Sequence, residues 1–277
     1  MTTKRGDEHM LPAHFTLYKE HHTYTLFRLE LTPSLPALFL RPRKFSPPYP
    51  TFFFLHYYRG SKENLLPLAQ EFAKNGFAAL AIDMEYHGER RKEGRDLLST
   101  DLKDDLLAFR RTLDSALLSL EFLETWEEID KGAIYFLGVS LGAILGVTVC
   151  REYRRFQKAI FVVGGGNLET LIAESMLDSI VEIRYDLRRR GIPIREATQD
   201  FHDFEPLFSV RHLSSAPLLF LNATHDEIVP QGCTFDLYEA APSPKKLSWF
   251  PAGHGLLFAP TFRISRRIVE FALEKNV

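Results

Sequence analysis

The chain of 277 residues has little of what several protein classes require. Its two cysteines, Cys150 and Cys233, are too few for a disulfide-stapled secreted scaffold, and neither stands in a C-x-x-C metal pair. Basic residues number 34 against 36 acidic ones, so the net charge of −2 shows no basic excess typical of nucleic-acid or anionic-membrane binders. With 45% hydrophobic and 25% charged residues, the composition indicates an ordinary folded protein.

Signatures of nucleotide and metal chemistry are missing as well. The sequence contains no P-loop, and the three glycines at 164–166 lack the G-x-G-x-x-G spacing that opens a dinucleotide-binding helix. No histidine or carboxylate group has a metal-binding spacing such as H-x-x-x-H. We therefore expect neither a metal nor a cofactor.

One uncharged run, residues 133–150, reaches the minimum length for a membrane span. Its small and polar residues and its closely flanking charges favour a buried strand that turns into a buried helix. Residues 1–10 are polar and charged, without the apolar segment of a secretory signal. The sequence thus predicts a soluble, cytoplasmic protein with no membrane span.

Strand-like and helix-like segments alternate along most of the chain. A half-buried strand is predicted at 24–31, with a strand at 35–40 paired to it, and buried strands are predicted at 51–58, 77–83 and 133–139. Further strands are predicted at 159–163, 218–222 and 246–251. Helices are predicted at 61–74, 101–126, 141–155, 231–241 and 260–275. This alternation predicts one α/β domain over 1–277, with a mostly parallel central sheet, helices on both faces and an antiparallel start.

Residues 167–213 interrupt the alternation, because a simple crossover needs one helix and not 47 residues. Apolar residues recur in this segment at helical spacing. We interpret it as a helical lid inserted over one end of the sheet, and the alternative is a crossover helix followed by a long loop. Under the lid interpretation, Met176 and Ile180 line the substrate pocket.

A G-x-S-x-G pattern, Gly138-Val139-Ser140-Leu141-Gly142, falls between a predicted strand and a predicted helix. A serine at such a sharp turn takes a strained backbone conformation, and small neighbours prevent clashes with the adjacent chain. The N–H of Leu141 then lies at a helix N-terminus, where developing negative charge is stabilised. The pattern predicts Ser140 as a nucleophile and Leu141 as an oxyanion-hole donor.

A serine nucleophile requires a base, and the base requires an acid that orients it. His254 lies between two glycines just after a predicted strand, and Asp226 follows the predicted strand before that one. Ser140, Asp226 and His254 stand in the chain order of an α/β-hydrolase triad. The neighbouring Glu227 is the alternative acid.

From residue 51 onward, the chain resembles the dienelactone-hydrolase and prolyl-oligopeptidase-like branch of the α/β-hydrolases. The matching pieces are FLHYYRGSKEN, AIDMEYHGER, FLGVSLGA, LLFLNATHDEIVP and FPAGHG. The resemblance implies the α/β-hydrolase fold, with Ser140 as nucleophile, His254 as base and Asp226 as acid. It thus assigns the same three residues as the chain order does.

The same resemblance implies a second oxyanion donor in a His-Gly-x turn after the third strand. This chain has His56-Tyr57-Tyr58 at that place, so the N–H of Tyr58 is the candidate donor. Tyr57 stands where glycine is usual, and we expect it beside the substrate. A tyrosine hydroxyl could also reach the substrate there.

These motifs predict a cofactor-free serine hydrolase that cleaves carboxylic esters of short-to-medium acyl chain through an acyl-enzyme. The alternatives are an oligopeptidase-type amidase and a non-catalytic binding protein with the hydrolase fold. The expected partner is a small-molecule ester and not a nucleic acid. The sequence leaves the oligomeric state open, a homo-oligomer included.

Overall fold

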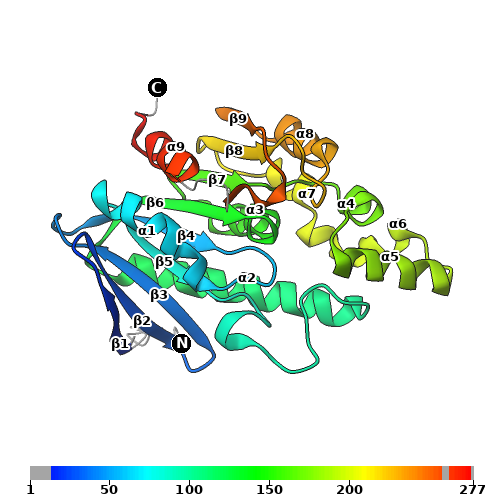
Figure 1. Ribbon diagram of the computed structural model, residues 1–277, viewed down its shortest axis with the longest axis horizontal. Coiled ribbons are helices and arrows are strands. Elements are labelled where there is room, and N and C mark those ends of the chain that lie inside the picture. The colour runs from blue at the N-terminus through cyan, green and yellow to red at the C-terminus, as the bar shows by residue number, and fades with distance from the viewer. Residues whose placement is uncertain (1–13, 258–261, 276–277) are drawn as a thin grey trace, which may run out of the picture.

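A computed structural model of the protein describes residues 14–257 and 262–275 (Figure 1). Within these residues, nine strands form one sheet in the order β1-β2-β3-β5-β4-β6-β7-β8-β9. Pairing is antiparallel from β1 to β5 and parallel from β5 through β4 to β9, so the mostly parallel sheet with an antiparallel start is confirmed. The strands are β1 (His14–Glu20), β2 (Tyr24–Thr32), β3 (Leu35–Pro42), β4 (Tyr49–Leu55), β5 (Ala78–Ile82), β6 (Ile129–Val139), β7 (Lys158–Val162), β8 (Leu218–Ala223) and β9 (Lys245–Phe250).

Helices cover both faces of the sheet, as the sequence predicts. On one face lie α1 (Leu66–Lys74) and α9 (Phe262–Leu273), and on the other lie α2 (Leu102–Thr125), α3 (Leu141–Tyr153) and α8 (Gln231–Ala240) (Figure 1). The predicted start of the last helix, at residue 260, lies outside the described residues.

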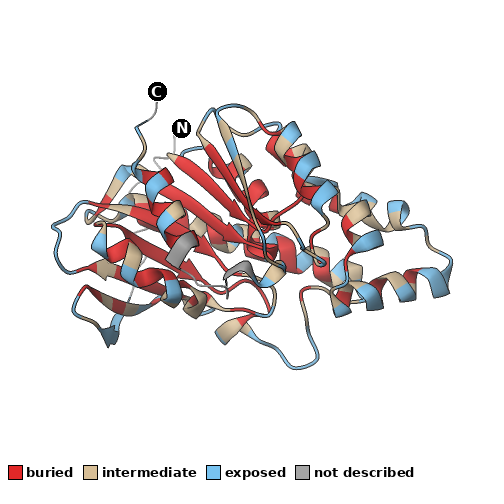
Figure 2. Ribbon diagram, turned by 45° about the horizontal axis from the view of Figure 1, so that its top comes forward, coloured by how far each residue is buried: buried red, intermediate tan, exposed pale blue. Residues whose placement is uncertain are grey.

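The central strand β4 shows why the sheet is covered twice. Phe53 and Leu55 pack into the core beneath α2 and α3, whereas Phe52 and Phe54 pack into the core beneath α1. Successive side chains of a strand point to opposite faces, so an uninterrupted apolar run requires a helix layer on each side. Figure 2 shows the central strands buried along most of their length.

The segment between β7 and β8 contains several short helices that extend beyond the sheet (Figure 1). Those that project are α4 (Leu168–Glu174), α5 (Asp178–Arg190) and α6 (Ile194–Thr198), and they are followed by the 3₁₀ helix η3 (Gln199–Phe204) and by α7 (Pro206–Val210), which packs against α3 and α8. Ile183 and Leu187 are the buried apolar side chains of α5, while most of its other residues are exposed or half-buried. The segment is therefore helical and packs through a narrow apolar stripe.

Candidate active site

Ser140 occupies a sharp turn between β6 and α3. Its backbone has φ of +52° and ψ of −117°, and its N–H donates to the carbonyl oxygen of Val162 at 2.8 Å. A Cβ on Gly142 would lie 2.4 Å from the carbonyl oxygens of Leu55 and His56, and a Cβ on Gly138 would lie 2.4 Å from that of Gly142. Only glycine fits at these two positions, so the two glycines of the G-x-S-x-G pattern are there because the turn leaves no room for a side chain.

The structure brings the three predicted side chains together. Ser140 Oγ lies 2.8 Å from His254 Nε2, and His254 Nδ1 lies 2.8 Å from Oδ2 and 2.9 Å from Oδ1 of Asp226. Each residue follows a parallel strand, β6, β8 or β9, at the carboxyl edge of the sheet. The geometry thus favours Asp226 over Glu227 as the group that orients the imidazole.

The surroundings of Asp226 fix its carboxylate. Its side chain is 4% exposed, and Oδ1 also accepts the backbone N–H groups of Ile228 and Val229, each at 2.9 Å. An ionised carboxylate accepts hydrogen bonds only, so His254 donates from Nδ1. The lone pair of Nε2 then faces the hydroxyl of Ser140, which is the arrangement a base needs to accept the serine proton.

Two backbone N–H groups are candidate oxyanion donors, those of Leu141 and Tyr58, whose residues border the same cavity as Ser140. Leu141 is the first residue of α3, so its N–H is one of those without an acceptor inside the helix. Tyr58 follows the carboxyl end of β4, three residues after Leu55. Both positions match those expected of oxyanion donors.

His56 holds the loop that carries Tyr58. Its side chain is fully buried, Nδ1 donates to the carbonyl oxygen of Tyr57 at 2.7 Å, and Nε2 accepts the N–H of Met84 at 3.1 Å. Burial lowers the pKa of His56 to about 3, so the ring stays neutral and serves as donor and acceptor at once. Sequence reasoning identified this histidine by its motif and missed this positioning role.

The two tyrosine hydroxyls already have protein partners. Tyr58 donates to Oδ2 of Asp96 at 2.7 Å, and the Tyr57 hydroxyl accepts from Nδ2 of Asn64 at 2.9 Å. Burial raises the pKa of Tyr58 to about 12. A neutral, engaged phenol favours the backbone amide of Tyr58, and not its hydroxyl, as the oxyanion donor.

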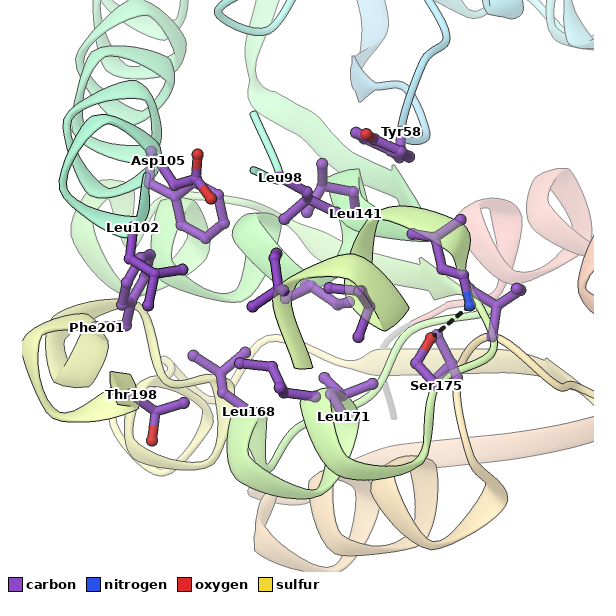
Figure 3. A pocket seen from close by; sticks show the side chains of 18 of the residues that line it. Tyr58, Leu98, Leu102, Asp105, Leu141, Leu168, Leu171, Ser175, Thr198 and Phe201 are labelled. Atoms are coloured by element: carbon purple, nitrogen blue, oxygen red, sulfur yellow. Dashed lines mark hydrogen bonds between the residues drawn. The ribbon is translucent and has the colours of Figure 1, made fainter. Parts of the chain in front are cut away.

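Two cavities meet at Ser140. The larger encloses about 830 Å³, part of it open to solvent, and has an apolar wall (Figure 3). Its lining includes Leu98, Phe109, Ile144, Leu171, Ile180 and Phe201. The smaller encloses about 460 Å³ and includes Tyr57, Val139, Val163 and His254 in its lining, and Tyr58 borders both cavities.

The prediction for Met176 is wrong. Its side chain is 62% exposed, and Leu177 instead borders both cavities. The reason is a break in the helix: Ser175 ends α4 with an extended ψ of 138°, and α5 begins after Leu177. The helical spacing that placed Met176 and Ile180 on one face therefore does not continue through the segment, and of these two only Ile180 borders the larger cavity.

Neither cysteine contributes a reactive thiol. Cys150 and Cys233 are both buried and unbonded, and burial raises the pKa of each thiol. Within residues 14–257 and 262–275, no cluster of three or more His, Cys, Asp or Glu side chains is suited to a metal ion. In that same part of the chain, the helices are too short or too polar to cross a membrane.

Known proteins resemble this chain in sequence and in structure. No protein-family model matches the chain. The Bacillus subtilis (strain 168) protein named "Putative esterase YitV" is 25% identical over 203 residues, which are 70% of this chain and 75% of that protein.

Solved structures match more of the chain at lower identity. The acetyl xylan esterase from Paenibacillus sp. R4 has a TM-score of 0.77 and 20% identity, and the match covers 94% of this chain and 89% of that one. The alpha/beta hydrolase GrgF from Penicillium sp. sh18 has a TM-score of 0.64 and 16% identity, with 95% and 98% covered. The chain therefore has the α/β-hydrolase fold, as the sequence resemblance implies.

Proposed function

We propose that the protein is a serine hydrolase that cleaves carboxylic esters through an acyl-enzyme. The observation that carries this proposal is the hydrogen-bonded series from Ser140 through His254 to Asp226, of which Ser140 borders both cavities. The names of the YitV relative and of the Paenibacillus structure, both esterases, support an ester as the substrate.

In the first half of the reaction, Ser140 Oγ attacks the ester carbonyl while His254 Nε2 accepts the hydroxyl proton. The N–H groups of Leu141 and Tyr58 stabilise the oxyanion that forms. His254 then gives this proton to the departing alcohol oxygen, and the acyl group remains on Ser140. In the second half, His254 takes a proton from water while the water oxygen attacks the acyl carbonyl. His254 then returns this proton to Ser140 Oγ as the bond between Oγ and the acyl carbon breaks, and the carboxylic acid leaves.

The positions of the two cavities support an assignment of the two parts of the ester. His254 must reach the departing oxygen, and its side chain borders the smaller cavity, so the alcohol part lies there. The acyl part then occupies the larger, apolar cavity, which suits a short-to-medium chain. Residues 167–213 form much of that cavity's wall and act as a lid that excludes water.

A variant in this segment tests the lid. Ile180→Ala enlarges the acyl cavity, so the preferred acyl chain should lengthen by one or two carbons while hydrolysis of acetate continues. Each buried methylene changes kcat/KM by about a factor of four, from roughly 0.8 kcal/mol. The measurement is kcat/KM for 4-nitrophenyl esters from acetate to octanoate.

Met176→Ala is the matched control, because Met176 lies in the same segment with its side chain in solvent. It should give the profile of the parent protein. If Ile180→Ala also leaves that profile unchanged, residues 167–213 lie away from the bound acyl chain.

Labelling by a fluorophosphonate probe tests the proposed function itself. The probe reacts with an activated serine, so stoichiometric labelling at Ser140 supports a hydrolase, and its absence favours a non-catalytic binding protein. A panel of 4-nitrophenyl esters and matched 4-nitroanilides then separates an esterase from an amidase. Hydrolysis of the anilides at rates near those of the esters would contradict the proposal.

A further inference from the structure

The wall of the larger cavity carries one charged residue among those described, Asp105 (Figure 3). It lies in the first turns of α2, and the residue is 2% exposed. Its Oδ2 accepts the N–H of Ser99 at 2.8 Å, and its Oδ1 accepts the Ser99 hydroxyl at 2.7 Å. A carboxyl group in an otherwise apolar pocket is unusual, because desolvation of its charge is costly.

No cation compensates this carboxyl group among the ion pairs of the described residues. The neighbouring Asp104 pairs with Arg95 at 3.0 Å, whereas Asp105 has only Ser99. Burial accordingly raises the pKa of Asp105 to about 7. Each carboxylate oxygen can accept two hydrogen bonds, so the contacts with Ser99 leave acceptor capacity on both oxygens.

The other polar side chains of this wall, Ser140 apart, are engaged locally. Ser175 Oγ accepts the N–H of Leu177 at 3.2 Å, which is the dashed line in Figure 3. The Thr198 hydroxyl donates to the carbonyl oxygen of Arg195 at 3.2 Å, and the Tyr58 hydroxyl donates to Asp96. Asp105 is therefore the group that a donor on the substrate would meet.

We propose that Asp105 determines acyl specificity by accepting a hydrogen bond from a hydroxyl group on the acyl chain. The inference rests on the proposed esterase function and on the placement of the acyl part in the larger cavity. An unsubstituted chain would cover the carboxylate and leave its acceptor capacity unused, whereas a hydroxyl satisfies it. An ammonium group fits less well, because the apolar wall offers nothing else to replace its hydration.

The test compares 4-nitrophenyl esters in pairs: 3-hydroxybutanoate with butanoate, 6-hydroxyhexanoate with hexanoate, and 8-hydroxyoctanoate with octanoate. Within a pair, the leaving group and chain length are the same, so the ratio of kcat/KM reports recognition of the hydroxyl. At about pH 8.5, above the pKa of Asp105, the carboxyl group is ionised. In at least one pair the parent protein should then favour the hydroxy ester by about tenfold or more, the effect of one hydrogen bond to a charged group. A preference for 6-aminohexanoate over 6-hydroxyhexanoate would overturn the assignment of a neutral donor.

Asp105→Ala should reverse this ratio in favour of the unsubstituted ester, as expected of an apolar pocket. Asp105→Asn retains an acceptor and a donor for Ser99, so this variant should fold even if Asp105→Ala does not. Its ratio should fall several-fold relative to the parent protein, because the amide oxygen is uncharged. Ser99→Ala is the control for a structural role, since it removes the hydroxyl contact and leaves the carboxylate in place. It should keep the preference of the parent protein.

The outcomes separate the two proposals. If the parent protein hydrolyses none of the esters, the proposed function fails. If it hydrolyses them all with ratios that neither Asp105 variant changes, the function stands and the role of Asp105 is wrong. If Ser99→Ala abolishes the preference as fully as Asp105→Ala does, Asp105 acts by shaping the loop before α2 and does not contact the acyl chain.

Discussion

Ser140→Ala should lower kcat for an activated ester by about 10⁴–10⁶, because the variant lacks the atom that attacks the carbonyl in the proposed mechanism. His254→Ala should cost about as much, since Ser140 without its base is a poor nucleophile. The double variant should lose little more than either single one, because the two side chains act as one unit through the 2.8 Å contact of Oγ with Nε2. Steady-state kinetics on 4-nitrophenyl acetate measure all three.

The stability of Ser140→Ala controls this experiment. The side chains of serine and alanine both start at a Cβ, so the strain of φ at +52° is the same in both proteins and the melting temperature should hardly change. Losses in kcat that add up in the double variant would contradict a shared mechanism. A large drop in melting temperature would instead assign Ser140 a structural role.

Asp226→Asn should reduce kcat by roughly 10³–10⁴. Oδ1 accepts the N–H groups of Ile228 and Val229, which keeps the oxygen of an asparagine on that side. The amide nitrogen would then take the place of Oδ2, 2.8 Å from His254 Nδ1, and donate to it. This forces the proton of the imidazole onto Nε2, where it blocks acceptance of the serine proton.

Glu227→Gln is the matched control, one residue away in the same loop, and it should change kcat far less. Kinetics over a pH series would separate a loss of base function from a loss of ester binding, which changes KM. If Glu227→Gln proves the more damaging substitution, the orienting acid is Glu227 and not Asp226.

Features encoded within a few neighbouring residues could be predicted from the sequence. The apolar run of β4 reflects the burial of that strand on both faces. The two glycines around Ser140 reflect a close approach of neighbouring backbone. Asp226 and His254 could be placed because parallel strands end at one edge of the sheet, so residues that follow those strands meet there.

Features that depend on packing between distant segments could not be predicted. The strand β1 is exposed at all seven residues, so no alternation of buried and exposed positions indicates it. The break at Ser175 shifts the helical phase although the apolar spacing continues in the sequence. Asp105 borders a cavity formed where α2 packs against the 167–213 segment, with the rings of Phe109 and Phe201 in contact, and no local pattern in the sequence reveals this packing.

The burial of His56 has a consequence for how the protein tolerates acid. The folded protein keeps this ring neutral down to a pKa of about 3, whereas an exposed histidine in the unfolded chain titrates near 6.5. Between these two pH values the unfolded state binds a proton that the folded state does not. The free energy of unfolding therefore falls as the pH is lowered, by up to about 1.4 kcal/mol per pH unit. Above pH 6.5 the residue has no such effect.

Urea unfolding of the parent protein and of His56→Asn at pH 7, 6, 5 and 4 would measure this linkage. The variant should be less stable at pH 7, because it weakens the contacts with Tyr57 and Met84, yet it should lose stability less steeply below pH 6.5. Equal slopes in the two proteins would mean that His56 takes up its proton while folded. Unequal slopes would mean that the side chain holding the loop with Tyr57 and Tyr58 also sets a lower pH limit for the folded protein.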